Sequence, residues 1–322
     1  MFAVTATSMD AADPLSGLTL GEVPDTAVPD GWVRVHVRAA SLNHHDLWSL
    51  KGVGLREDRL PMILGTDAAG VLDDGTAVVV HAVIGDPAAG GGDETLDPRR
   101  TLLSELHPGT HAETVAVPAR NVVAKPDELS FADAACLPTA WLTAYRMLDR
   151  ARLRVGDTVL VQGAGGGVAT AAIQLASVMG YQVWATSRDE GKRARAVELG
   201  AHEAFESGAR LPGKVDAVME TVGEATWSHS LRALRPGGTV VVSGATSGPN
   251  PPSDLNRVFF LQLSVVGSTM GTRDELEALL ALVVDTGVRP TVDGSFDLRD
   301  ARDAYARLAS GDVVGKLVLT NG

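Results

Sequence analysis

Residues 159–180 read VLVQGAGGGVATAAIQLASVMG, and this stretch decides the fold. A short apolar strand runs into a glycine-rich loop, and a helical pattern follows at once and ends at Gly180. The loop glycines are Gly163, Gly165, Gly166 and Gly167. Without side chains the loop backbone can approach a pyrophosphate, to which the start of the helix offers free N–H groups and a positive dipole. Small Ala169 stands where the dinucleotide fingerprint has its last glycine, so the stretch predicts a dinucleotide-binding strand–loop–helix unit.

Short apolar runs alternate with helical segments on both sides of this loop. The runs DTVLVQG, YQVWATS, VDAVMET and GTVVVSG begin at residues 157, 181, 215 and 238. The segments between them are long enough for crossover helices, which predicts a doubly wound parallel sheet. Residues 1 to about 121 show strand and turn patterns instead, with the alternating run GWVRVHVRAA at 31–40. Residues 86–100 are rich in glycine, proline and charge, and we expect an exposed loop there.

The end of the second predicted strand, 181–187, bears on the choice of cofactor. An NAD site commonly places an acid there to bind the 2′-hydroxyl of the adenosine ribose. This chain instead has Ser187 and Arg188, with Lys192 on the next predicted helix. These residues suit a 2′-phosphate, so we favour NADPH. The acids at 189–190 count against that choice, and NADH stays open.

Charge and cysteine content exclude several other classes of partner. The 322-residue chain has a formal net charge of −12 and no basic run, which argues against nucleic acid or an anionic membrane as partner. The sequence shows neither a signal peptide nor an apolar stretch long enough to span a bilayer. Its single cysteine, Cys136, allows no internal disulfide and fits a reducing compartment, so we expect a cytoplasmic protein.

Several motifs together resemble one family across almost the whole chain. They are SLNHHDLWSLKG (41–52), PMILGTDAAGV (61–71), GTHAETVAVPA (109–119), DAACLPTAWLTAYRML (133–148), the glycine loop, ETVGEATWSHSLRALRPGGTVVVSGATSG (220–248), VVGSTMGTRDELEALL (265–280) and VVGKLVL (313–319). The set resembles the medium-chain dehydrogenase/reductase superfamily, and most of all its zinc-independent quinone oxidoreductase branch. The resemblance implies a GroES-like, mostly β catalytic domain at 1–121, completed by 264–322. It also implies a Rossmann domain at 122–263 and a homodimer.

The same comparison bears on metal binding. Zinc-dependent relatives carry a cysteine ligand at the position of Asn43 and a histidine ligand at that of Thr66. Their structural zinc needs four cysteines in the loop that corresponds to 86–106, which has none here. Asn and Thr are poor zinc ligands, so we expect no zinc. The adjacent His44 and His45 diverge whether the segment is helical or extended, although a site rebuilt from one histidine with the acids at 46 and 67 stays open.

The resemblance implies NADPH-dependent reduction of a quinone or an α,β-unsaturated carbonyl by hydride transfer. It implies cofactor contacts from Asn43, Thr143, Gly166, Gly167, Val168, Ser187, Arg188, Lys192, Ser243, Gly244 and Lys316. Asn43 is expected near the nicotinamide. Some relatives have a tyrosine where Trp48 stands, so the candidate proton donors here are His44, His45, Asp46 and water. Two alternatives remain: an alcohol dehydrogenase-type enzyme with an atypical metal site, and a non-catalytic NADPH-binding protein.

Overall fold

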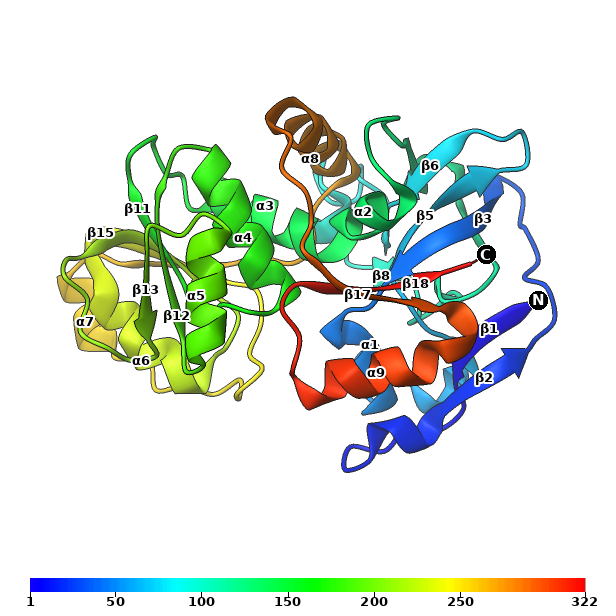
Figure 1. Cartoon of the computed structure of the whole chain (residues 1–322), viewed down its shortest axis with the longest axis horizontal. Helices are drawn as coiled ribbons and strands as arrows, with labels where there is room; N and C mark the ends of the chain where they lie inside the picture. Colours follow the sequence, from blue (N-terminus) through cyan, green and yellow to red (C-terminus); the bar gives the residue numbers. More distant parts are fainter. Residues whose placement is uncertain (322) are drawn as a thin grey trace. The chain divides into compact units, whose positions relative to one another are not determined.

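A computed structural model describes residues 1–321 and divides the chain into two compact units (Figure 1). The first, here called the catalytic unit, comprises Met1–Leu142 and the chain from Met270 onward. The second, called the nucleotide unit, comprises Thr143–Thr269. Within residues 1–321, no helix has both the length and the apolar character needed to cross a bilayer.

The nucleotide unit is built on a parallel sheet with the order β13-β12-β11-β14-β15-β16. Its strands are β11 (Thr158–Val161), β12 (Gln182–Ser187), β13 (Glu203–Glu206), β14 (Val215–Glu220), β15 (Leu234–Val242) and β16 (Ser264–Gly267). Its helices are α3 (Leu142–Arg150), α4 (Gly167–Val178), α5 (Glu190–Glu198), α6 (Glu224–Ala233) and α7 (Leu255–Phe260). The chain runs outward from β11 in one direction and then from β14 in the other. This confirms the doubly wound Rossmann sheet, in which ligands generally bind at the carboxyl ends of the strands where the chain reverses direction, here β11 and β14.

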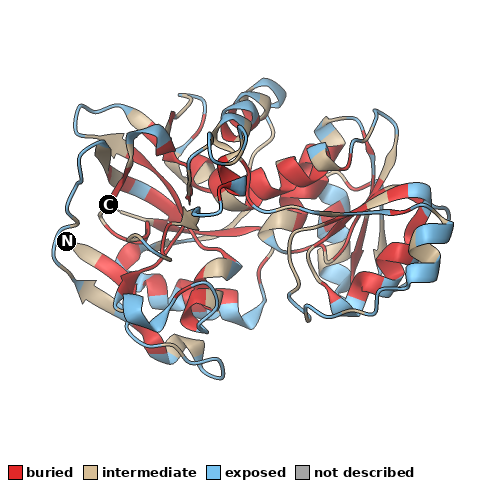
Figure 2. Cartoon of the chain, turned by 180° about the vertical axis from the view of Figure 1, so that it is seen from behind, coloured by how far each residue is buried: buried red, intermediate tan, exposed pale blue. Residues whose placement is uncertain are grey.

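The strands of this sheet form because their residues are apolar on both faces. Val159, Leu160 and Val161 of β11 are all buried, as a parallel strand covered on both sides requires. Helix α4 packs on β11 and β12, α5 on β12 and β13, and α6 on β14 and β15. Figure 2 shows buried residues following the strands and the inner faces of the helices.

The catalytic unit is mostly β and takes in the end of the chain. Its larger sheet has the order β10-β6-β5-β3-β18-β17, with β9 also paired to β3, and β2-β1-β4 and β7-β8 form smaller sheets. The strands are β1 (Phe2–Ala6), β2 (Leu18–Glu22), β3 (Trp32–Ser41), β4 (Met62–Ile63), β5 (Asp67–Leu72), β6 (Ala77–Val80), β7 (Val83–Ile84), β8 (Thr101–Leu102), β9 (Thr114–Pro118), β10 (Val122–Ala124), β17 (Val292–Asp297) and β18 (Lys316–Thr320). The last strand, β18, pairs antiparallel with β3, so the tail joins the larger sheet of the catalytic unit.

Helices close the catalytic unit, and short helical turns join its strands. The helices are α1 (His44–Leu50), α2 (Phe131–Ala135), α8 (Arg273–Thr286) and α9 (Ala301–Ser310). The 3-10 turns are η1 (Pro14–Gly17), η2 (Glu57–Arg59), η3 (Glu94–Leu96), η4 (Ala119–Asn121) and η6 (Leu298–Asp300), and η5 (Leu137–Trp141) is a π-helical turn.

The unit boundaries differ from the predicted domain boundaries at both junctions. Residues 122–142, predicted to belong to the Rossmann domain, lie in the catalytic unit, because β10 pairs with β6 and α2 packs on β3 and β5. Strand β16, predicted to belong to the catalytic domain, extends the Rossmann sheet by pairing with β15. Both differences arise from strand pairing between segments distant in sequence.

The segment 86–100 is a loop in which most residues are exposed, as predicted, whereas Glu94, Thr95 and Asp97 are buried. The carboxylate of Asp97 accepts a hydrogen bond from the backbone N–H of Asp86 at 2.8 Å. Buried Glu94 accepts one from the N–H of Arg273 at 2.8 Å, at the start of α8. Carboxylates that accept backbone hydrogen bonds thus hold the few buried residues of this mostly exposed loop in place.

Candidate active site

The glycine loop follows β11 and is shaped by two residues in unusual backbone conformations. Gly163 has φ +71° and Gly165 has φ +146°, a range that side chains rarely adopt. A Cβ atom at Gly163 would lie 2.7 Å from Cγ2 of Val222, which follows β14. The N–H of Ala164 donates to the carbonyl of Thr186 at 2.8 Å and so ties the loop to the end of β12. Backbone geometry therefore accounts for glycine at 163 and 165.

Gly166 has a different reason to be glycine. It is the N-cap of α4 with φ −71°, an ordinary conformation for any residue, and no side chain caps the helix there. Apart from its own backbone and its neighbours along the chain, no protein atom lies within 4 Å of the position that a Cβ would take. Neither backbone strain nor a protein neighbour requires glycine here. The open space above the start of α4 fits the close approach of a pyrophosphate to the backbone of Gly166, Gly167 and Val168.

The end of β12 presents the residues predicted to bind the adenosine ribose. Arg188 is exposed, and the side chain of Lys192 lies across the glycine loop, with its Cδ 2.8 Å from where a Cβ of Gly165 would be. Asp189, one of the acids that argued against NADPH, caps α5, since its Oδ1 accepts from the N–H of Lys192 at 2.7 Å. The carboxylate of Asp189 is thus hydrogen-bonded to the first turn of α5, and the side chain of Lys192 lies over the glycine loop.

The remaining predicted cofactor residues of the nucleotide unit are Thr143, Ser187, Ser243 and Gly244. Ser187 ends β12, and Ser243 and Gly244 directly follow β15, so these three lie at carboxyl ends of the sheet. Thr143 is buried on α3. The N–H of Ser243 donates to the carbonyl of Glu220 at 3.0 Å. The buried carboxylate of Glu220 accepts from the N–H groups of residues 222 and 223 and so holds the neighbouring loop.

Asn43 is the centre of a buried polar cluster in the catalytic unit. Its backbone N–H donates to Asp46 Oδ2 at 2.7 Å, which caps α1 and leaves the Asn43 amide side chain for other contacts. Its Nδ2 donates to Asp67 Oδ2 at 2.9 Å and to Thr66 Oγ1 at 3.2 Å. Lys316 Nζ donates to Asn43 Oδ1 at 2.5 Å and lies 3.5 Å from Asp67 Oδ2. Lys316, predicted to contact the cofactor, is thus buried against Asn43 and Asp67.

The residues at the zinc-ligand positions do not fit a zinc ion. Asn43 and Thr66 offer an amide and a hydroxyl, and they bond directly to each other. Thr66 Oγ1 also lies 3.0 Å from Oγ1 of Thr139, so the space among them is closed by hydrogen bonds. Over the described part of the chain, no group of three or more His, Cys, Asp or Glu residues is arranged to hold a metal ion. Zinc also prefers thiolate, imidazole or carboxylate ligands, so this donor set is unsuited to it.

The two adjacent histidines face different surroundings on α1. His44 is exposed, whereas the side chain of His45 is 15% exposed and its Nε2 lies 3.1 Å from Oε1 of Glu105. His45 Nδ1 lies 4.0 Å from Oδ1 of Asp46. Burial by itself lowers the pKa of His45, but Asp46 and Glu105 together outweigh burial and raise the pKa to about 9. His45 therefore carries a proton at neutral pH.

Asp46 stays ionised although it is fully buried. Burial raises its pKa, but His111, His45 and the backbone N–H of Asn43 favour the charged form and hold the pKa below its usual value. Because burial also lowers the pKa of His111 and keeps it neutral, we attribute the effect on Asp46 mainly to His45 and Asn43. His45 and Asp46 form an imidazolium–carboxylate pair beside Asn43.

Two residues of this cluster, Glu105 and Thr139, were not predicted from the sequence. Glu105 lies 60 residues from His45, and no local pattern marks it. Thr139 follows Pro138 in the π-helical turn η5, and the proline that interrupts a helical segment is the one local signal of an irregularity there.

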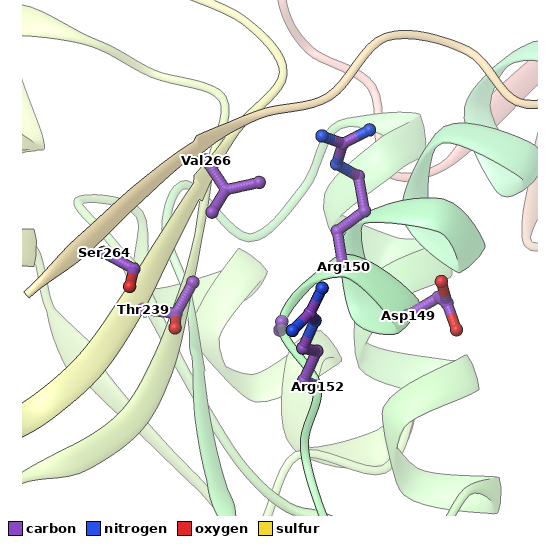
Figure 3. Close-up of a pocket in the computed structure, with 7 residues that line it drawn as sticks. Asp149, Arg150, Arg152, Thr239, Ser264 and Val266 are labelled. Carbon is purple, nitrogen blue, oxygen red and sulfur yellow. The ribbon is translucent and has the colours of Figure 1, made fainter. Parts of the chain in front are cut away.

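A cavity of about 500 Å³ lies in another part of the nucleotide unit (Figure 3). Its lining comes from the end of α3 and from β15 and β16, namely Asp149, Arg150, Ala151, Arg152, Thr239, Ser264 and Val266. It includes none of the predicted site residues. The cofactor site therefore rests on the glycine loop and not on this cavity.

Comparison with known proteins supports the resemblance over the length of the chain. A model of the alcohol dehydrogenase GroES-like domain matches residues 29–127, and one of zinc-binding dehydrogenases matches 167–285. Acryloyl-coenzyme A reductase from Metallosphaera sedula is 30% identical over 325 residues, which cover 94% of this chain and 96% of that protein.

Two solved structures share the fold. An NAD-dependent alcohol dehydrogenase superposes with a TM-score of 0.92 at 33% identity and covers 100% of both chains. The 2-octenoyl-CoA carboxylase reductase CinF, in complex with NADP and 2-octenoyl-CoA, superposes with a TM-score of 0.91 at 26% identity, covering 99% of this chain and 87% of that one. With a GroES-like unit, a Rossmann unit and relatives over nearly its whole length, the chain belongs to the medium-chain dehydrogenase/reductase superfamily and is an NAD(P)H-dependent oxidoreductase.

Proposed function

We propose that the protein reduces the carbon–carbon double bond of an α,β-unsaturated carbonyl compound with NADPH. The observation that carries this proposal is the cluster around Asn43, where hydrogen-bonded amide, hydroxyl and ammonium groups take the place of zinc ligands. Alcohol oxidation in this fold needs a device that stabilises an alkoxide, whereas conjugate reduction needs mainly an oriented acceptor and a proton source. The relatives named for acryloyl-CoA and 2-octenoyl-CoA support an unsaturated thioester or ketone as acceptor.

The choice of NADPH is supported by the end of β12. Arg188 and Lys192 provide cations for a 2′-phosphate, and the carboxylate of Asp189 is occupied in capping α5. The NADP complex of CinF agrees with this choice, and the NAD-dependent alcohol dehydrogenase keeps NADH as the alternative.

The catalytic unit would orient the acceptor and complete the reaction with a proton. Bound NADPH supplies a hydride for the β-carbon of the acceptor. The π bond breaks, the α-carbon then takes a proton, and the acceptor is reduced while the cofactor is oxidised. His45 is the proposed proton source, since it is protonated at neutral pH and part of its side chain meets solvent, from which it can regain a proton. Asn43 is the proposed contact of the nicotinamide carboxamide.

A quinone is a second acceptor class that the same arrangement accommodates, since a quinone also accepts hydride and proton.

We further propose that the enzyme works without zinc, as a homodimer and in the cytoplasm. The poor fit of Asn43 and Thr66 to zinc supports the first of these. Strand β16 supports the second, because within residues 1–321 its outer side pairs with no strand. The single buried cysteine supports the third.

The test is NADPH consumption by the purified protein with three acceptor panels: enoyl-CoA thioesters, simple enones and quinones. We expect turnover with at least one unsaturated carbonyl and retention of full activity after dialysis against a chelator. Tight NADPH binding without turnover on any panel would instead favour a non-catalytic cofactor-binding protein. Activity that depends on about one zinc per chain would favour an alcohol dehydrogenase-type enzyme.

A further inference from the structure

A continuous chain of hydrogen bonds runs through the polar cluster from Lys316 to Thr139. Lys316 Nζ donates to Asn43 Oδ1 at 2.5 Å, and Asn43 Nδ2 donates to Thr66 Oγ1 at 3.2 Å. Thr66 Oγ1 lies 3.0 Å from Thr139 Oγ1. The chain begins at a buried ammonium and ends at a hydroxyl.

The chemistry of its members sets the direction of this chain. An ammonium group only donates, so Asn43 accepts with its oxygen and donates with its nitrogen. Thr66 then accepts from Asn43, and its own buried O–H needs an acceptor inside the protein. Thr139 Oγ1 is the acceptor within reach, so this oxygen accepts the hydrogen bond from Thr66. The hydrogen of the Thr139 hydroxyl then remains available for another acceptor.

Thr139 differs from the other members in its exposure and its backbone. Lys316, Asn43 and Thr66 are buried, whereas Thr139 is only half-buried. It lies in the π-helical turn η5, a geometry that occurs frequently at functional sites. Within residues 1–321 its side chain has no hydrogen-bond partner besides Thr66. The hydrogen-bond chain that begins at the Lys316 ammonium therefore ends at the half-buried hydroxyl of Thr139. The chain polarises this O–H group and leaves it free to donate.

We infer that the hydroxyl of Thr139 donates a hydrogen bond to the carbonyl oxygen of the acceptor. This inference rests on the proposed function and deepens it. As hydride adds to the β-carbon, negative charge develops on that oxygen, and a donor already in place lowers the energy of the transition state. Thr139 is then a catalytic residue, and Thr66, Asn43 and Lys316 position and polarise it. Together they do at the carbonyl oxygen what a Lewis-acidic ion does elsewhere.

The test compares Thr139→Val, which keeps the shape and removes the hydroxyl, with Thr139→Ser, which keeps the hydroxyl. We expect Thr139→Val to lower kcat about tenfold or more, since loss of one such donor costs up to ~10³-fold in well-studied sites. The NADPH dissociation constant, read from cofactor fluorescence, should stay unchanged, and Thr139→Ser should keep most of the activity. Thr239→Val, at a half-buried threonine of β15, is the matched control and should change neither quantity.

A second set of variants tests the hydrogen-bond chain that leads to Thr139. Thr66→Val removes the donor to Thr139, so it should lower kcat, and Thr66→Ser should restore it. Because both threonines act through one oxygen, the loss in Thr66→Val/Thr139→Val should be smaller than the product of the single losses. Unchanged kcat in Thr139→Val, or an equal loss in Thr139→Ser, overturns the inference while leaving the proposed function intact. A wild type that binds NADPH and reduces no acceptor overturns both.

Discussion

Nε2 of His45 lies 3.1 Å from Oε1 of Glu105, which joins the start of α1 to a loop 60 residues further along the chain. Glu105 is also held by the backbone N–H of Leu102, which donates to its Oε2 at 3.2 Å. The glutamate is thereby fixed beside the imidazole. It acts with Asp46 to raise the pKa of His45, and we expect this pairing to make both stability and activity depend on pH.

The first prediction concerns pH. The pKa of His45 rises from 6.5 to about 9 on folding, so the folded protein binds a proton that the unfolded chain has lost between these values. The stabilisation is complete below about pH 6.5, decreases as pH rises and is gone above about pH 9. Its full size is on the order of 3 kcal/mol. Urea unfolding at a series of pH values measures it, and kcat should fall over the upper part of the same range, since the proposed proton donor is lost.

His45→Gln provides the control, because glutamine can still hydrogen-bond to Glu105 but does not titrate. Its free energy of unfolding should be flatter than that of the wild type between pH 6.5 and 9. If the two proteins keep the same pH dependence, His45 is not the group responsible.

The second prediction separates two glycines of the same loop. At Gly166, asparagine suits the N-cap of α4 and meets no protein atom, so Gly166→Asn should leave the free energy of unfolding within about 0.5 kcal/mol. Its side chain should fill the space proposed for the pyrophosphate and weaken NADPH binding at least about tenfold. Calorimetric titration and urea unfolding measure the two effects.

Gly163→Ala should show the opposite pattern, with its main effect on the free energy of unfolding and not on NADPH binding. The alanine would have to adopt φ +71°, and its Cβ would lie 2.7 Å from Cγ2 of Val222. We therefore expect the free energy of unfolding to fall by about 1–2 kcal/mol. Undiminished NADPH affinity in Gly166→Asn would count against the glycine loop as the pyrophosphate site.

The Rossmann sheet was predictable because its signals are local. Strand 159–161, the glycine loop and α4 follow one another directly, and each has its own periodicity or composition. The polar cluster was only partly predictable. Asn43 and Asp46 belong to a recognisable motif, whereas Thr139 reaches Thr66 across 73 residues and Glu105 reaches His45 across 60. Such contacts depend on how strands pair over long distances, and no sequence periodicity records that.

Composition predicted the exposed loop at 86–100 but not its buried residues, which include Glu94 and Asp97. Charged and glycine-rich segments are usually exposed, since burying a carboxylate without partners is costly. Here the carboxylates of Glu94 and Asp97 accept backbone hydrogen bonds, which offset that cost. The domain boundaries were displaced for a related reason, because β10 and β16 join sheets through partners that the local sequence does not identify.

The third prediction concerns the choice between NADPH and NADH. If Arg188 and Lys192 bind the 2′-phosphate, Arg188→Ala/Lys192→Ala should weaken NADPH about 10- to 100-fold, the loss expected for one or two hydrogen bonds to a charged group. NADH affinity should change little. Arg195→Ala removes a cation from the same helix, where Arg195 pairs with Glu198 at 2.7 Å, and should affect neither cofactor. Equal weakening of both cofactors would mean that these cations do not read the 2′-phosphate.

The fourth prediction concerns assembly through the edge of the Rossmann sheet. Strand β16 pairs with β15 on one side, and over the described residues no strand pairs with its other side. Val265 on this strand is 50% exposed, and Phe260 on the preceding helix α7 is 79% exposed. An open edge next to exposed apolar side chains is a surface that proteins normally cover. We therefore expect a homodimer in which the β16 strands of two copies pair, with twice the 33.5 kDa mass of one chain in light scattering.

Val265→Lys places a charge on that edge and should shift the protein to the monomer, because a lysine on an edge strand opposes strand pairing. Val197→Lys, at a similarly exposed valine of α5, should leave the dimer intact. A wild type that is monomeric at micromolar concentration, or a Val265→Lys variant that stays dimeric, would show that β16 is not the interface. The two variants carry the same added charge, so a difference between them reports on the strand edge and not on the net charge of the chain.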